Sequence, residues 1–349
     1  MNHDIDVKAT RINCFRQSKI AGEFMLQLRV PGSIIDAKHL QAVQHIAQTW
    51  GDGSFHIGMR HTLNIPGIKY ASIPEVNEYI NEYIREVEVV NCDADMETCG
   101  KGYPTIGARN IMSCIGNTHC IKANVNTHEL AKKLEKEIFP SHYHIKSTIS
   151  GCPNDCGKAH FNDFGVIGIA KMEYDRDRCI GCGACVDACS HHATRVLSLV
   201  NGKIEKDTCC CVGCGECVIA CPTSAWTRNP QKFYRIMLGG RTGKQYPRMG
   251  KMFANWVTED VVIGIFRNWP KFSAWALDYK PVYLHGGHLI DRAGYIKFKE
   301  LILEGLEINP EAQFAERIYW QEDEKRANIN VKSLGNHNSA GPGSQDSHH

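Results

Sequence analysis

The sequence predicts an α+β fold that is interrupted by an inserted, cysteine-rich module. Stretches with strand and helix periodicity succeed one another in the first and last parts of the chain. Residues 171–229 differ from both parts, because Cys, Gly and Ala dominate them. Within this segment, one eleven-residue cysteine pattern begins at Cys179 and again at Cys211. Since mixed α/β character returns after the module, we expect it to divide one domain into two pieces.

Residues 1–90 are expected to form a half-domain of ferredoxin-like type. Apolar and polar residues alternate over residues 24–30, which is typical of a half-buried strand. Helical spacing follows from Asp36, as N-cap, to Trp50, and again over residues 76–87. A second alternation lies between these helices, and its apolar face would consist of Phe55, Ile57, Met59, Leu63 and Ile65. This β-α-β-α order predicts the half-domain.

The pieces on either side of the module, residues 91–170 and 230–325, are expected to form a second domain. The periodicity predicts helices near residues 130–138, 253–268 and 296–306, and strands near 143–149 and 164–170. The tail, residues 326–349, is rich in Asn, Ser, Gly and His and is expected to be disordered.

The composition argues against nucleic acid and membrane as partners. The 40 Lys and Arg residues nearly balance the 38 Asp and Glu residues, which leaves a net charge of +2. The mean hydropathy is −0.32, and no apolar run approaches the length of a membrane span. The N-terminus lacks the apolar core of a signal peptide, so we expect a cytoplasmic protein. In a reducing compartment, the 17 cysteines favour metal ligation over disulfides.

Eight cysteines of the module form two runs with the spacing of bacterial ferredoxins. Each run follows C-x2-C-x2-C-x3-C, and the residues are Cys179, Cys182, Cys185, Cys189, Cys211, Cys214, Cys217 and Cys221. In two-cluster ferredoxins the fourth cysteine of each run binds the cluster of the other run. We therefore expect Cys189 to join the second run and Cys221 to join the first. Zinc is the weaker alternative, because it needs C-x2-C pairs separated by a longer loop.

Four further cysteines have a different spacing. Cys114 and Cys120 are separated by five residues, and Cys152 and Cys156 by three. This pattern resembles the siroheme-dependent sulfite and nitrite reductases. The resemblance implies that the four cysteines bind a 4Fe-4S cluster and that Cys156 also bridges to the siroheme iron. A shared thiolate would allow electrons to be delivered singly to a multi-electron reduction.

The resemblance extends over nearly the whole chain. It includes the stretches GMRHTLNIPG, GARNIMSC, GCPNDC, CIGCGACVDACSHHA, LGGRTGK and NPEAQFAERIYW. It implies nitrite/sulfite reductase-like siroheme domains with an inserted two-cluster ferredoxin-type domain, and hence siroheme and three 4Fe-4S clusters. It further implies a catalytic subunit that reduces sulfite to hydrogen sulfide. Electrons would come through a ferredoxin-like iron-sulfur subunit and an NADH-oxidising flavin subunit.

Two other functions stay open from the sequence alone. A siroheme nitrite reductase would use a similar anion pocket and the same number of electrons. A polyferredoxin would only transfer electrons, and the second cysteine pattern argues against it. The chain itself is not expected to bind NADH, because no G-x-G-x-x-G fingerprint follows a predicted strand.

Sulfite and the siroheme carboxylates are anions, and basic side chains occur in the shared motifs. The resemblance implies substrate-binding roles for Arg60, Arg109 and Lys146. His144 stands where some relatives have a further lysine, and it could bind sulfite, donate protons or fill space. The predicted partners of the siroheme carboxylates are Arg241, Lys244, Arg248 and Lys251. No role is assigned to the remaining cysteines, Cys14, Cys92, Cys99, Cys209 and Cys210.

Overall fold

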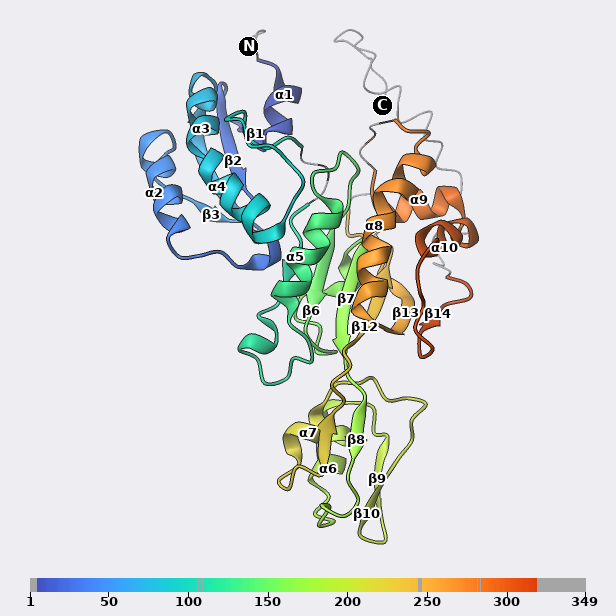
Figure 1. Cartoon of the computed structure of the whole chain (residues 1–349). Coiled ribbons are helices and arrows are strands. Elements are labelled where there is room, and N and C mark those ends of the chain that lie inside the picture. Colours follow the sequence, from blue (N-terminus) through green and yellow to red (C-terminus); the bar gives the residue numbers. More distant parts are fainter. Residues whose placement is uncertain are drawn as a thin grey trace, which may run out of the picture.

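The computed structural model describes residues 5–105, 107, 109–243, 247–280, 282 and 284–318. Two sheets with their helices form the upper part of the molecule in Figure 1, and a small lobe projects below them. The predicted site residue Lys244 and the predicted tail, residues 326–349, lie outside the described residues.

The first sheet is antiparallel and has the order β1-β2-β4-β3. Its strands are β1 (Phe15–Gln17), β2 (Glu23–Leu28), β3 (His56–Ile57) and β4 (Leu63–Lys69). The helical elements are α1 (Val7–Ile12), α2 (His39–Thr49), α3 (Ile73–Tyr79), α4 (Asn81–Ile84) and the π-helix Arg85–Val90. The alternation predicted from residue 24 is confirmed, because every second residue of β2 is buried.

The strand predicted over residues 55–65 is wrong, because the chain turns within it. The Gly58 amide donates to the Thr62 carbonyl over 2.7 Å, and His61 adopts a positive φ of 57°. The residue Met59, assigned to the buried face, is 92% exposed. The two short alternating stretches on either side of the turn have the same phase, so the sequence alone does not reveal the turn. As a consequence, Arg60 lies in a hairpin turn and not on the face of a strand.

The second sheet has six strands in the order β14-β13-β12-β7-β6-β5. Strands β5, β6 and β7 run parallel, and the other pairs are antiparallel. The strands are β5 (Met112–Ser113), β6 (Ser147–Ser150), β7 (Phe164–Ile169), β12 (Phe233–Leu238), β13 (Lys251–Val257) and β14 (Gln313–Phe314). Their neighbours are η1 (Pro31–Ser33), η4 (Gly116–Thr118) and η5 (Ala159–Phe161).

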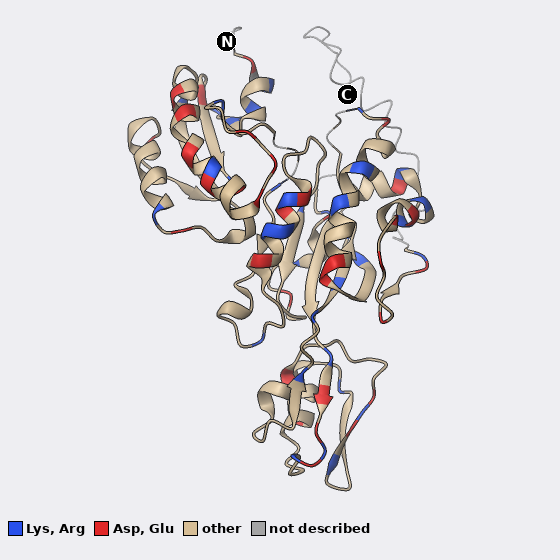
Figure 2. Ribbon diagram, viewed as in Figure 1, with Lys and Arg blue, Asp and Glu red and all other residues tan. Residues whose placement is uncertain are grey.

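Helices α5 (Thr127–Ile138) and α8 (Glu259–Ala276) lie side by side over this sheet (Figure 1). Both signs of charge occur on them (Figure 2), and Arg267 of α8 pairs with Glu137 of α5 at 2.9 Å. Helices α9 (Gly286–Ala293) and α10 (Tyr295–Leu303) follow. The helix predicted near residues 130–138 is confirmed. The helix predicted near residues 253–268 starts later than predicted, at Glu259, because residues 251–257 pair with β12 as a strand.

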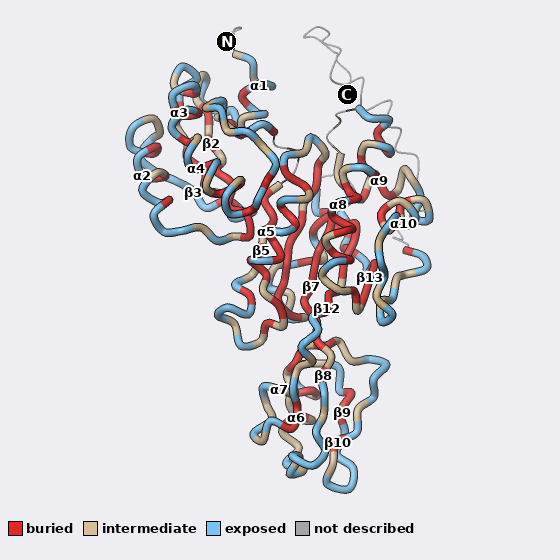
Figure 3. The backbone as a smooth tube through the Cα atoms, viewed as in Figure 1, coloured by how far each residue is buried: buried red, intermediate tan, exposed pale blue. Residues whose placement is uncertain are grey.

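The chain leaves the second sheet at the end of β7, builds the lobe and returns as β12, the antiparallel neighbour of β7. The lobe contains β8 (Met172–Tyr174), α6 (Ala184–His192), β9 (Leu197–Val200), β10 (Lys203–Lys206), α7 (Glu216–Ala220) and β11 (Trp226–Arg228). Buried side chains around Trp226 give the lobe a small core of its own. Figure 3 shows the buried stretches of its backbone in red. Among the described residues, no helix combines the length and apolar character that crossing a bilayer requires.

A buried ion network joins the two upper units of the molecule, that is, the first sheet with its helices and the six-stranded sheet with its helices. Arg29, which follows β2, contacts Glu88 Oε1 at 2.7 Å and Glu135 Oε2 of α5 at 2.6 Å. The other oxygen of Glu135 accepts a hydrogen bond from the Ile111 amide. The other oxygen of Glu88 is buried without a hydrogen-bond partner among the described residues. Burial therefore raises the pKa of Glu88 from 4.5 to about 7, against the attraction of Arg29.

We predict that Glu88→Gln removes a pH dependence of stability. Because the pKa of Glu88 is higher in the folded than in the unfolded chain, the folded state holds an extra proton between about pH 4.5 and 7. The free energy of unfolding should consequently fall as the pH rises through this window, and a neutral glutamine should flatten that slope. Denaturant unfolding of the wild type and of Glu88→Gln at pH 5 and pH 8 measures the two slopes.

Glu135→Gln is the matched comparison. Its amide cannot accept from both Arg29 and Ile111, so it should lose about 3 to 5 kcal/mol at both pH values. An unchanged pH slope in Glu88→Gln would show that another group is responsible.

Candidate active site

A strongly cationic cavity lies between the two upper units. It encloses about 1070 Å³ of empty space, part of which is open to solvent. Six basic side chains line it, namely Arg11, Arg16, Arg29, Arg60, Arg109 and Lys146. No carboxylate belongs to the described lining. Such a lining attracts anions, because opposite charges in a partly desolvated cavity interact more strongly than in water.

The predicted substrate residues Arg60, Arg109 and Lys146 come together at this cavity. Arg60 reaches it from the hairpin turn and donates to Asn162 Oδ1 at 2.9 Å and to the Ser147 carbonyl at 2.9 Å. Burial lowers the pKa of Lys146, and the neighbouring arginines act in the same direction. A bound anion would reverse this effect and favour the charged lysine.

The positions of these groups follow from the parallel strands. Arg109 precedes β5 and Lys146 precedes β6, and β5 and β6 are parallel neighbours. Residues that precede parallel strands meet at one edge of the sheet. The Arg109 amide, which donates to the Ile145 carbonyl at 3.1 Å, fixes the two segments to each other at that edge.

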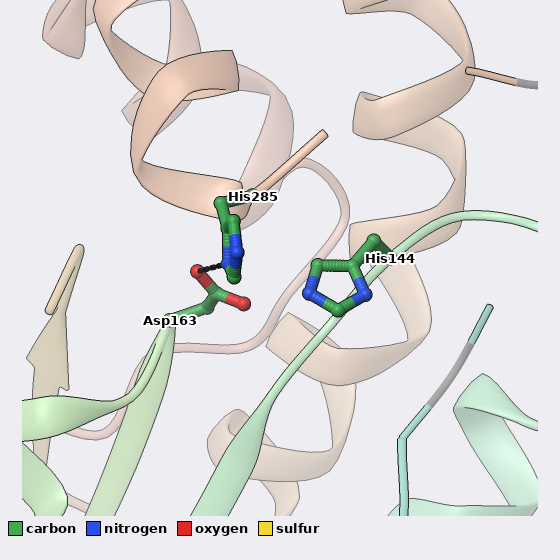
Figure 4. Close-up of side chains that lie close together, drawn as sticks. All are labelled: His144, Asp163 and His285. Carbon is green, nitrogen blue, oxygen red and sulfur yellow. Dashed lines mark ion pairs between the residues drawn. The ribbon is translucent and has the colours of Figure 1, made fainter. Parts of the chain in front are cut away.

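His144 does not line the cavity but lies behind it. It is 1% exposed and packs edge-on against His285, with 4.6 Å between ring centroids. Figure 4 shows both rings beside Asp163. Burial holds the pKa of His144 well below its ordinary value, so the ring is neutral at physiological pH. A role for His144 as a charged sulfite ligand is therefore not supported by this placement.

The predicted siroheme contacts Arg241 and Arg248 are not among the described residues that line the cavity. Both are buried and contact Asp291 of α9, at 3.3 Å and 3.0 Å respectively. Arg248 also donates to the carbonyls of Gly239 and Gly287. These bonds attach the loop after β12 to α9. Lys251 is exposed at the start of β13.

The four cysteines of the second pattern gather at the opposite edge of the parallel strands. Cys114 follows β5, and Cys152 and Cys156 follow β6. Cys114, Cys120 and Cys156 all lie close enough to add to the rise in the pKa of Cys152, whose largest cause is burial. Two sulfurs accept hydrogen bonds, Cys114 from the Gly151 amide at 3.1 Å and Cys156 from Asn154 at 3.3 Å.

In the lobe, the fourth cysteine of each run lies with the opposite run. Cys189 lines one pocket together with Cys211, Cys214 and Cys217. Cys221 interacts electrostatically with Cys179 and Cys185 of the first run. Cys182 is exposed. This arrangement agrees with the exchange that the spacing predicts.

Several cavity residues escaped the sequence analysis. Arg11 and Arg16 lie close together in the stretch RINCFR, a local density of charge that could have been noticed. Arg29 occupies a strand-like stretch and gave no signal. His285 begins the stretch HGGH and reaches the cavity only because α9 packs beside Asp163.

The fold carries cationic residues at one edge of its parallel strands and four cysteines at the other. This combination is that of a reductase with a 4Fe-4S domain. The model of the nitrite and sulphite reductase 4Fe-4S domain matches residues 106–309, and that of the nitrite/sulfite reductase ferredoxin-like half domain matches residues 16–83. The chain belongs to the nitrite and sulfite reductase family. This confirms the family resemblance of the sequence and the nitrite/sulfite reductase-like fold.

Among its relatives is one of the subunits of the anaerobic sulfite reductase of Salmonella typhimurium. The two are 52% identical over 336 residues, which cover 96% of this chain and 100% of that protein. The chloroplastic ferredoxin–nitrite reductase of Spinacia oleracea is 21% identical over 166 residues, or 47% of this chain and 26% of that protein. The crystal structure of dissimilatory sulfite reductase I has the same fold, with a TM-score of 0.57 at 17% identity, and the match spans 91% of this chain and 78% of that one.

We predict that Lys146→Met weakens anion binding without disturbing the fold. Methionine keeps the apolar stem but removes a charge that interacts with a unit anion by roughly 4 kcal/mol at about 4 Å and an effective dielectric of about 20. Sulfite affinity and turnover should fall at least about tenfold, which is roughly 1.4 kcal/mol.

Lys132→Met on α5 is the control, because Lys132 lies outside the cavity in a surface pair with Glu129. Absorption spectra of both variants should match the wild type before kinetics are compared. An unchanged kcat and KM in a fully loaded Lys146→Met enzyme would place the essential cation elsewhere.

Proposed function

We propose that this chain is the catalytic subunit of an anaerobic sulfite reductase, which reduces sulfite to hydrogen sulfide. The observation that carries the proposal is the pairing of a cationic cavity with a four-cysteine group at opposite edges of the same three parallel strands. The similarity to an anaerobic sulfite reductase polypeptide over that protein's full length supports it. Nitrite reduction is less favoured, because the nitrite reductase relatives match only part of this chain.

The residues present fit the cofactors of the family. A siroheme carries eight carboxylates, and the cavity is lined by six basic side chains and no described carboxylate; of the six, Arg29 is already paired with Glu88 and Glu135. Cys156, at the edge of the strands where the cysteines gather, would bind the siroheme iron, and Arg11 and Arg16 would face its carboxylates from the cavity. The C-x2-C-x2-C-x3-C spacing of the lobe cysteines suits cubane clusters, in which each thiolate binds a different iron.

Bound siroheme would supply the iron at which sulfite is reduced, and the adjoining cluster would supply electrons to it. The chain's own residues bind and orient the substrate. Arg109 offers a planar fork of donors to the sulfite oxygens, and Lys146 offers a compact charge. Arg60 is held by Asn162 and Ser147, so its guanidinium is preorganised for the anion.

The lobe is a two-cluster ferredoxin-type domain that passes electrons to the four-cysteine group. Lys122, two residues after Cys120, contacts Glu216 Oε1 of α7 at 2.8 Å. Asn124 donates to the Gly213 carbonyl at 3.1 Å and accepts from Arg228 at 2.9 Å. These contacts hold the second run next to the Cys120 loop. We infer that electrons enter at the Cys179 run and leave through the Cys211 run.

The electrons would come from a ferredoxin-like iron-sulfur subunit and an NADH-oxidising flavin subunit. A cytoplasmic location accords with this assembly. All seventeen cysteines are among the described residues, and none of them forms a disulfide. The domains we propose are residues 1–90, residues 91–170 together with 230–325, and the insert, residues 171–229.

We predict about 13 iron atoms per chain in anaerobically purified protein, from three four-iron clusters and one siroheme. The same preparation should show a siroheme absorption band and should reduce sulfite in preference to nitrite with a low-potential dye. Stoichiometric zinc, or about eight irons without a siroheme band, would overturn the proposal.

We predict that Cys214→Ser affects two electron sources differently. With partner subunits and NADH, sulfite reduction should fall at least about tenfold, because the relay through the lobe is broken. With a small dye that reaches the catalytic end directly, the loss should be smaller. Cys209→Ser is the matched control, since Cys209 is exposed and precedes the ligand run. Equal losses with both electron sources would contradict the relay.

A further inference from the structure

One histidine at the cavity has no part in the function proposed above. The side chain of His285 is 30% exposed and lines the cavity. Its Nδ1 lies 3.6 Å from Asp163 Oδ1, an ion-pair distance, and Asp163 itself is 1% exposed (Figure 4). A half-exposed imidazole backed by a buried carboxylate is an arrangement that serves proton transfer.

Asp163 is held in a fixed position. Its Oδ2 accepts from the Lys146 amide at 2.9 Å, and its Oδ1 accepts from the Gly286 amide at 3.0 Å. Burial alone would raise the pKa of Asp163, but the contact with His285, the neighbouring His144 and the Lys146 amide together lower it. The carboxylate is therefore ionised, and it stands beside the His285 ring at a fixed place.

The two histidines of this group are not equivalent. His144 is buried, lies behind the cavity and stays neutral, whereas His285 reaches the cavity. Ligand atoms of His144, Asp163 and His285 lie within 4.8 Å of one another, which could also suit a metal ion. A metal is disfavoured, because the adjacent lining is cationic and two backbone amides already bind the carboxylate.

We propose that His285 is a general acid that donates protons to the substrate in the cavity, with Asp163 as its positioning residue. The inference rests on the proposed function, since sulfite reduction consumes protons: HSO3⁻ + 6 e⁻ + 6 H⁺ gives HS⁻ + 3 H2O. Each cleavage of an S–O bond takes two electrons and two protons and releases one water. His285 donates from Nε2 to the departing oxygen and regains its proton from solvent at the open side of the cavity.

Charged and titratable groups surround His285 on several elements. The Asp163 carboxylate stands behind the ring, and Arg109 and Lys146 belong to the same cavity lining as His285. His144 and His288 of α9 are the remaining titratable neighbours, and burial keeps the pKa of each low. A general acid loses activity as the pH rises and its proton is lost.

The test compares the holoenzyme with His285→Gln. Sulfite binding is followed by the change it causes in the siroheme absorption spectrum, and dye-driven turnover is measured from pH 6 to pH 9. The variant should bind sulfite within about twofold of the wild type. Its kcat at neutral pH should fall at least about tenfold, and the loss of activity on the alkaline side should disappear. His45→Gln, on an exposed part of α2, is the control for a histidine outside the cavity.

The outcomes separate this inference from the proposed function. A wild-type enzyme that fails to reduce sulfite would overturn the function, whereas equal kcat and pH profiles for the wild type and His285→Gln would overturn only the inference. Weaker sulfite binding with unchanged kcat would make His285 a binding residue and would also overturn it. If His285→Gln retains less siroheme, the deciding measurement is the turnover of His285→Ala with and without added imidazole. Restored turnover per siroheme supports the proposal, and no restoration rejects it.

Discussion

The concentration of positive charge at one cavity is the constraint on which the other features depend. Six basic side chains repel one another there, although the net charge of the chain is only +2. The carboxylates that balance them are buried behind the cavity lining. Glu88 and Glu135 pair with the Arg29 side chain. Asp163 accepts a hydrogen bond from the backbone amide of Lys146. Because the counter-charges are buried and anchored, they hold the cations in place without closing the cavity to anions.

The parallel strands separate the two kinds of chemistry. Cationic groups precede β5 and β6, whereas the cysteines and the lobe follow β5, β6 and β7. A substrate anion and the protons it consumes can thus approach one edge of the sheet while electrons arrive at the other. An antiparallel sheet would place consecutive strand ends at alternating edges and would mix the two sets. The connection made by Lys122 and Asn124 keeps the lobe on the electron side.

Local patterns in the sequence predicted local features well. The cysteine spacing predicted which residues meet in the lobe, because short loops fix thiolates at fixed intervals. The alternation of β2 predicted its buried face. The prediction of a single strand over residues 55–65 was wrong, because the alternation of apolar residues continues in the same phase across a turn. Arg29, Asp163 and His285 gave no signal, since their roles arise from contacts between segments over 50 residues apart.

The arginines of the loop after β12 have a structural role whether or not they also contact a ligand. Arg241 and Arg248 stand in a glycine-rich stretch that suggested an anion, yet both bind Asp291. A buried arginine needs a charged or hydrogen-bonding partner, and Asp291 of α9 supplies one to both. These bonds fix α9, whose N-cap residue is His285 and whose Gly286 amide binds Asp163. Arg241 and Arg248 therefore act on the cavity through the position of this helix.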